Sequence, residues 1–127
     1  MSILKISYRP DPSYEGYISV RLIGEFAGVG GFSGEPSAFA DLADKLASYP
    51  IDANDPPAFG AEEVDIEIVP ADSVGHLRLT LALGYPTGPC SYLRASFRTE
   101  YAWIARFEQA LRTFIAAPQE ELVLEIR

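Results

Sequence analysis

Hydrophobic and polar residues alternate most regularly in His76–Leu83, which reads His-Leu-Arg-Leu-Thr-Leu-Ala-Leu. Leucine occupies every second position, and Arg78, Thr80 and Ala82 lie between the leucines. A period of two is typical of a β-strand with one buried and one exposed face, because successive side chains point to opposite sides of a strand. The pattern predicts a central strand here, and we interpret the remaining segments around it.

Weaker alternation of the same kind predicts further strands. Val64–Ile68 alternates apolar residues with two acids, and a turn at Pro70–Gly75 would join it to the leucine strand. A tight turn sets Ile68 opposite Leu77 and Glu67 opposite Arg78, and the second pair is a favourable cross-strand charge pair. The same reasoning predicts strands at Ile3–Tyr8, Tyr17–Phe26, Tyr92–Arg98 and Leu122–Ile126.

Two segments have the spacing of amphipathic helices. We predict one helix over about Glu100–Ala116, with the Thr99 hydroxyl as its N-cap. A second helix is predicted from Pro36, which suits a first helical turn, to about Ser48. The glycine-rich segment Gly28–Gly34 before it is predicted to be a flexible turn, and residues 50–61 are assigned no regular structure. The stripe of the longer helix is Ile104, Phe107, Leu111, Phe114 and Ile115.

The predicted order of elements is ββ-α-βββ-α-β. Strands that are joined by hairpins and have one apolar face need a layer of helices to cover that face. We therefore expect a two-layer α+β domain, with a mostly antiparallel sheet and both helices packed on one side of it. A chain of 127 residues is the usual size of one domain, so residues 1–127 are interpreted as a single unit.

The formal net charge of −8 is unevenly distributed along the sequence. Residues 41–72 contain nine acids and one base, Lys45, whereas residues 76–127 contain five acids and six bases. Such a balance disfavours binding to nucleic acid or to anionic membranes. It favours either a basic protein partner or simple solubility, and the sequence leaves both open. The candidate partner-binding residues are Asp41, Asp44, Asp52, Asp55, Glu62, Glu63, Asp65 and Glu67.

Candidate chemistry elsewhere in the sequence is incomplete. Ser33 lies where a nucleophile elbow would place a serine, but Glu35 replaces the last glycine of that motif. The glycines around it lack the lysine of a phosphate-binding loop. His76 and Asp72 have no further histidine or cysteine pair to complete a metal site, and Cys90 has no histidine nearby in sequence to activate it. We therefore predict no catalytic, cofactor-binding or metal-binding residues and no cofactor.

The sequence also bears on the compartment. A single cysteine cannot form an internal disulfide, and no apolar run approaches the roughly 18–20 residues of a membrane span. The first ten residues lack the apolar core and cleavage site of a secretory leader. A cytoplasmic protein is expected.

Three segments in this order resemble a family. Gly30-Gly-Phe-Ser-Gly-Glu35 runs into Phe39-x-x-Leu42-x-x-x-Leu46, and Val64–Ile68 is followed by a turn and Gly75-His-Leu-Arg-Leu-Thr-Leu81. The third segment, Leu93-Arg-Ala-Ser-Phe-Arg-Thr-Glu100, leads into Ile104-x-x-Phe107. Together, over about residues 16–116, they resemble the small immunity proteins that accompany polymorphic, wall-associated bacterial toxins.

The resemblance implies a non-catalytic inhibitor that binds a cognate toxin domain inside the producing cell. Many such toxins act on nucleic acids and have basic clefts, so the acidic block would be the binding surface. Two alternatives stay open. One is a small enzyme or ligand-binding domain with a pocket near Gly28–Gly34. The other is a homo-oligomeric structural subunit joined through an exposed edge strand.

Overall fold

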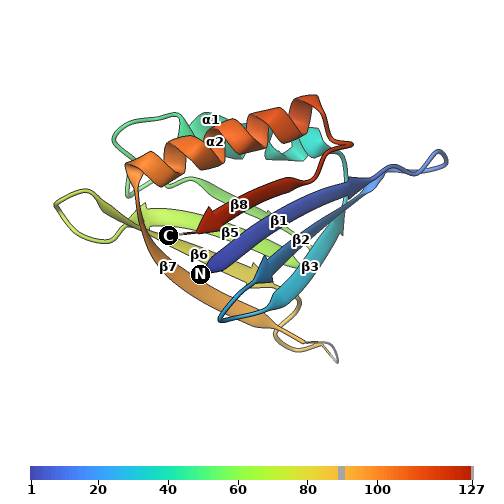
Figure 1. Cartoon of the computed structure of the whole chain (residues 1–127), viewed down its shortest axis with the longest axis horizontal. Helices are drawn as coiled ribbons and strands as arrows, with labels where there is room; N and C mark the ends of the chain where they lie inside the picture. The colour runs from blue at the N-terminus through green and yellow to red at the C-terminus, as the bar shows by residue number, and fades with distance from the viewer. Residues whose placement is uncertain (89–90, 127) are drawn as a thin grey trace.

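The computed structural model describes residues 1–88 and 91–126, and its strands form two four-stranded antiparallel sheets. Both helices lie next to one another across the same end of the two sheets (Figure 1). The predicted α+β class is confirmed, although the strands divide between two sheets instead of forming one. The first sheet has the order β3 (Gly28–Ser33), β2 (Tyr17–Ile23), β1 (Ser2–Arg9), β8 (Leu122–Ile126). The second has the order β4 (Ala58–Ala61), β5 (Val64–Pro70), β6 (His76–Leu83), β7 (Leu93–Glu100).

The leucine strand is confirmed as β6, with the predicted bounds. Its four leucines are each at most 1% exposed, and they face the core between the two sheets and the helices. Complete burial of a leucine side chain stabilises the folded state by about 1.5–3 kcal/mol. The alternation that predicted this strand therefore also marks the apolar face that holds the second sheet against the core.

The predicted register between β5 and β6 is wrong by two residues. Ile68 lies opposite Leu79 instead of Leu77, and Glu67 faces Thr80 instead of Arg78. The cause is a shorter turn: β5 continues through Pro70, and the Ala71 N–H donates to the His76 carbonyl at 2.8 Å. A shift by an even number of residues leaves every side chain on its predicted face, so the core is unchanged.

The glycine-rich segment forms the strand β3 and not the predicted turn. β3 runs beside the turn between β4 and β5, where the Glu63 N–H donates to the Gly31 carbonyl at 3.3 Å. A Cβ atom on Gly30 would lie 2.3 Å from the Glu63 carbonyl oxygen, so only glycine allows this approach. Glycine within a strand often marks such close contact between two backbones. The two sheets therefore meet at β3.

Two other predictions near the first helix need correction. The predicted helix from Pro36 to Ser48 is divided into a 3-10 turn, η1 (Pro36–Phe39), and the shorter helix α1 (Ala40–Leu46). Residues 50–61, which were assigned no regular structure, contain the edge strand β4. The strand is short, but the Ile68 N–H donates to the Pro57 carbonyl at 3.0 Å and places β4 beside β5.

The second helix is confirmed as α2 (Tyr101–Ala116), and its apolar stripe is buried except for Ile115, which is half-buried. The predicted N-cap is wrong: β7 continues to Glu100, which occupies the N-cap position without a side-chain hydrogen bond. Thr99 instead pairs with Leu77 within the sheet, and its hydroxyl is buried without a hydrogen-bond partner among the described residues. In residues 1–88 and 91–126, no helix has both the length and the apolar character needed to cross a membrane.

Candidate protein-binding surface

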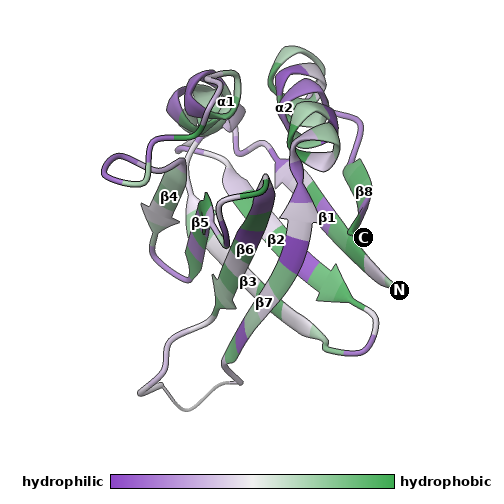
Figure 2. Cartoon of the chain, turned by 90° about the vertical axis from the view of Figure 1, so that its left-hand side faces the viewer, coloured by the Kyte–Doolittle hydropathy of each residue, from purple (hydrophilic) through white to green (hydrophobic). Residues whose placement is uncertain are grey.

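The eight acidic candidates come from neighbouring elements. α1, β4 and β5 lie on the same side of the molecule, as Figure 2 shows. Asp41 and Asp44 belong to α1, and Asp65 and Glu67 belong to β5. Asp52 and Asp55 lie in the connection between α1 and β4, and Glu62 and Glu63 form the turn between β4 and β5. We call these eight residues the acidic side.

Two of the eight carboxylates are paired with cations. Asp44 Oδ1 lies 3.1 Å from Arg112 Nη2, and Asp55 Oδ1 lies 2.7 Å from Lys45 Nζ. Arg112 also contacts Glu108 at 2.6 Å, and these carboxylates raise the pKa of its guanidinium above the ordinary value, the hydrogen bond to Glu108 most of all. Exposed pairs of this kind contribute only about 0–1 kcal/mol to stability, but they offset two of the negative charges.

Two further carboxylates hold the local backbone in place. Asp52 Oδ1 accepts a hydrogen bond from the Asn54 N–H at 2.8 Å, and Glu62 Oε1 accepts one from the Ser33 N–H at 3.2 Å. Glu62 itself has a left-handed backbone conformation with φ of 45°, as a tight turn requires. The second hydrogen bond joins the β4–β5 turn to the end of β3. Both carboxylates therefore already have hydrogen-bond partners within the chain.

The remaining four candidates, Asp41, Glu63, Asp65 and Glu67, have no side-chain hydrogen bond or ion pair with any residue in 1–88 or 91–126. Asp41, Asp65 and Glu67 are exposed, and Glu63 is half-buried. Burial raises the pKa of Tyr17 above its usual value, and the charges of Glu63 and Glu62 raise it further. These unpaired carboxylates are the part of the acidic side that remains available to a partner.

Asp65 and Glu67 line a shallow hollow of about 370 Å³ on the outer face of the second sheet. Across β6, the row that begins at Asp65 continues through Ala82 to Arg94 on β7. Asp65 on β5 and Arg94 on β7 are therefore two strands apart, and adjacent strands of a sheet are spaced about 4.8 Å apart. The sequence identified the acids of this hollow, but it did not identify Arg94 as its opposite wall, because the order of the strands was unknown.

A second hollow, of about 510 Å³, lies at the end of β3, where a pocket near Gly28–Gly34 was predicted for the ligand-binding alternative. It is lined by Ser33, Gly34 and Glu35 among others. Glu35 accepts a hydrogen bond from the Tyr8 hydroxyl at 2.5 Å and another from the Gly16 N–H at 3.3 Å, and the first bond raises the pKa of Tyr8. Its carboxylate is thus already used to join β1 to η1.

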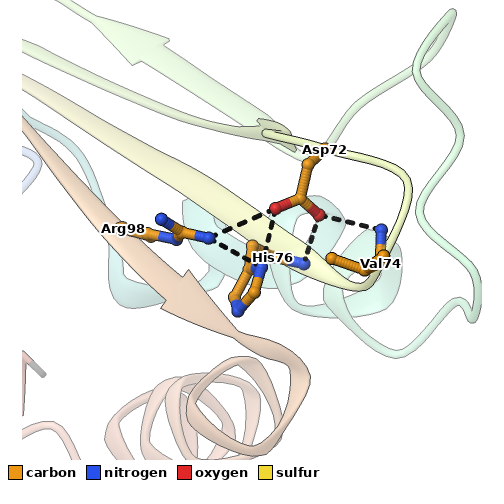
Figure 3. A network of polar contacts seen from close by, with 4 residues as sticks. All are labelled: Asp72, Val74, His76 and Arg98. Atoms are coloured by element: carbon orange, nitrogen blue, oxygen red, sulfur yellow. Dashed lines mark hydrogen bonds and ion pairs between the residues drawn. The ribbon is translucent and has the colours of Figure 1, made fainter.

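His76, which was considered with Asp72 as an incomplete metal site, belongs to a polar cluster at the start of β6 (Figure 3). His76 Nδ1 lies 2.6 Å from Asp72 Oδ2 and 2.9 Å from Arg98 Nη2. The Asp72 carboxylate also accepts the Val74 N–H at 2.9 Å, and this bond contributes most to holding its pKa below the usual value. The guanidinium of Arg98 therefore occupies the position beside His76 Nδ1 and Asp72 Oδ2 that a metal ion would need.

Ser33 and His76 lie on strands of different sheets, β3 and β6, and Cys90 lies outside the described residues. Within the described part of the chain, no group of three or more histidine, cysteine, aspartate or glutamate residues is arranged to hold a metal ion. Comparison of the sequence with models of known protein families and with curated proteins gives no match, so the interpretation of this surface depends on its own residues.

Proposed function

We propose that this chain is a non-catalytic protein-binding module, of the immunity-inhibitor type, that binds a basic partner domain through its acidic side. The observation that supports the proposal is the set of four carboxylates, Asp41, Glu63, Asp65 and Glu67, that have no partner among the described residues. They come from α1, the β4–β5 turn and β5, which lie on one side of the molecule (Figure 2), so a single basic surface can face several of them. Opposite charge on two partners accelerates their encounter, and it does so most at low ionic strength.

The contacts of the acidic side refine this proposal. Asp44 and Asp55 already have cationic neighbours in Arg112 and Lys45, so a partner gains less from them than from the unpaired carboxylates. Asp52 and Glu62 are needed for local turns. The electrostatic contribution to binding is therefore expected to come chiefly from Asp41, Asp65 and Glu67, which are exposed.

The test is affinity capture from the cell that produces the protein, followed by kinetics with the captured partner. The triple variant Asp41→Lys, Asp65→Lys, Glu67→Lys changes the net charge from −8 to −2, because each reversal adds two units. We expect its association rate with a basic partner to fall at least about tenfold at low salt. About 0.5 M NaCl should slow the unmodified protein in the same way.

A matched control separates this surface from the total charge. Glu15→Lys, Glu25→Lys, Glu120→Lys also gives −2, and these exposed residues lie outside the acidic side. Its association rate should fall much less. Equal slowing of both variants would show that only the net charge matters, and unchanged binding of both would remove the electrostatic proposal. Inhibitor function requires in addition that the chain suppress the captured partner's own activity at a stoichiometric ratio.

A further inference from the structure

β7 is an edge strand of the second sheet, and its net charge is positive, whereas that of β5 is negative. It pairs with β6 along its whole length, and no strand lies beyond it in the described structure. Its eight residues contain neither proline nor glycine, the residues that commonly interrupt an exposed edge. Such a regular edge is a template for an added strand.

The hydrogen-bond pattern shows which backbone groups of β7 are available. The His76 carbonyl accepts a hydrogen bond from the Ala71 N–H, directly after β5, and the Gly84 N–H donates one to the Glu63 carbonyl, directly before β5. Both residues of β6 and its continuation therefore form hydrogen bonds on the β5 side. Hydrogen-bonded pairs alternate along an antiparallel ladder, so the four leucines between these residues bond toward β7. Their partners in β7 are Leu93, Ala95, Phe97 and Thr99. The N–H and C=O groups of Arg94, Ser96 and Arg98 therefore point away from the sheet.

The exposed face of β7 carries two arginines and one acid, Glu100, so this edge has a net positive charge. Arg94 and Arg98 are exposed, and Arg98 lies directly opposite Arg78 of β6. Neither Arg78 nor Arg94 has an ion pair with any residue of the described ranges. Arg98 contacts Asp72, at 3.3 Å, through Nη2. Two arginines thus lie on the edge strand, and Arg78 lies beside Arg98 on β6, in a protein whose net charge is −8.

In the register centred on Ser96, this charge pattern argues against a second copy of the chain as the added strand. Two β7 strands that paired antiparallel about Ser96 would set Arg94 of one copy opposite Arg98 of the other, and like charges directly opposite are destabilising. An acid at each of those positions would instead be favourable. The inner face of β7 suits apolar residues, because Leu93 and Phe97 are only half-buried where the sheet ends.

We propose that β7 accepts an extended segment of a partner protein as an additional antiparallel strand, with acidic side chains four residues apart facing Arg94 and Arg98 and apolar residues between them. Backbone hydrogen bonds to Arg94, Ser96 and Arg98 supply the pairing, and the arginines select the sequence. This inference does not depend on the acidic side, which lies at the other end of the sheet.

The test uses the peptide acetyl-Thr-Glu-Val-Thr-Val-Glu-Thr-amide, which reads the same in both directions. In an NMR titration, we expect saturable shifts of the Arg94, Ser96 and Arg98 amides, together with slower hydrogen exchange at these three positions. The same peptide with lysine in place of glutamate should bind at least about fivefold more weakly, because the attraction of each glutamate to an arginine of β7 is replaced by repulsion between like charges. N-methylation of the central threonine, whose N–H faces β7, should abolish binding.

Two variants of the full chain locate the site. Ser96→Pro places proline where the N–H is not used by β6, a position that edge strands tolerate, and it should remove binding while the near-UV circular dichroism is retained. Arg94→Glu should raise the Kd about fivefold. Arg21→Glu, an equal change of charge on an exposed residue of β2, is the control and should leave the Kd unchanged.

Several results would overturn the proposal. These are no saturable binding by about 1 mM peptide, equal affinity for the glutamate and lysine peptides, or exchange protection confined to other strands. A dimer in light scattering with protection of Arg94, Ser96 and Arg98 would show that a second copy occupies the edge. If Ser96→Pro fails to fold, the methylated peptide and Arg94→Glu still decide the outcome, because neither alters the backbone of β7.

Discussion

At one end of the β4-β5-β6-β7 sheet, Asp65 and Glu67 project from the exposed face of β5; at the other end, Arg94 and Arg98 project from β7. The middle strand has Thr80 and Ala82 on the same face between them. One sheet therefore presents carboxylates at one end and guanidinium groups at the other. The net charge of −8 describes neither end. A search for partners that relied on this net charge would consider only basic proteins and would overlook an acidic partner of β7.

The two ends also differ in how they are held. The acidic end is attached to the other sheet, because the Glu63 N–H bonds to Gly31 and the Ser33 N–H bonds to Glu62. The β7 end keeps a row of backbone groups that no described residue uses. A rigid end suits recognition by fixed charges, whereas an unpaired edge suits recognition by backbone hydrogen bonds. The two surfaces are therefore built for different modes of binding.

The difference between the two ends depends most on the attachment of the acidic end to β3, and a substitution at Gly30 would disrupt this attachment. Gly30→Ala places a methyl group against the Glu63 carbonyl, whose oxygen lies 2.3 Å from an ideal Cβ position. Backbone cannot move aside as a side chain can, so we expect the free energy of unfolding to fall by about 3 kcal/mol. Urea denaturation monitored by circular dichroism measures this loss.

Gly60→Ala is the matched control for that substitution. Its Cβ would lie 2.8 Å from Asp65 Oδ1, a side-chain atom that can rotate away. The free energy of unfolding should change by less than about 1 kcal/mol. Equal losses in the two variants would contradict the view that the crossing of β3 over the Glu63 carbonyl is what requires glycine.

The glycine strand also shows where prediction from the sequence stops. β6 and α2 were predicted well because their side chains repeat with a period of two or of 3.6, and each pattern is visible locally. β3 has three glycines in six residues and so has no such pattern. Its strand conformation follows from contacts with Tyr17–Ile23 and with the β4–β5 turn, which a local reading of the sequence does not contain.

The candidate surfaces were predictable to a similar extent. The acidic block is visible in the sequence, but the pairing of Asp44 with Arg112 joins residues 68 positions apart and required the packing of α1 on α2. The register of β5 on β6 was wrong by two because alternation is the same after any even shift. The strand at Tyr92–Arg98 was predicted, and alternation along it places Arg94, Ser96 and Arg98 on one face. The position of β7 at an edge depends instead on strand order, which alternation does not encode.

A second prediction concerns the stability of the β7 end. The Thr99 hydroxyl is buried and has no hydrogen-bond partner among the described residues, and an unsatisfied buried hydroxyl costs free energy. Thr99→Val replaces it with a methyl group of similar size, so the free energy of unfolding should rise by about 1 kcal/mol. Thr80→Val, which instead removes a hydroxyl bonded to Ser96 at 3.1 Å, should give no gain. A loss of stability in Thr99→Val would mean that this hydroxyl is satisfied in solution.

A weaker effect is expected from the response of the β5–β6 turn to acid. The Val74 N–H and the His76 ring hold the pKa of Asp72 below its usual value of 3.8. A carboxyl whose pKa is lower in the folded state stabilises the protein above its unfolded pKa, and this contribution is lost as the pH falls through the folded pKa. Asp72→Asn should therefore reduce the difference in urea midpoint between pH 7 and pH 3.

Asp11→Asn, which removes a carboxylate that accepts the Ser13 N–H at 2.9 Å in another hairpin, is the control. If both variants show the same acid dependence as the unmodified protein, Asp72 does not stabilise the start of β6 through its charge. The contact of Arg98 with Asp72 would then contribute nothing to the order of the β7 edge, and Arg98 would be as available to an acidic partner as Arg94.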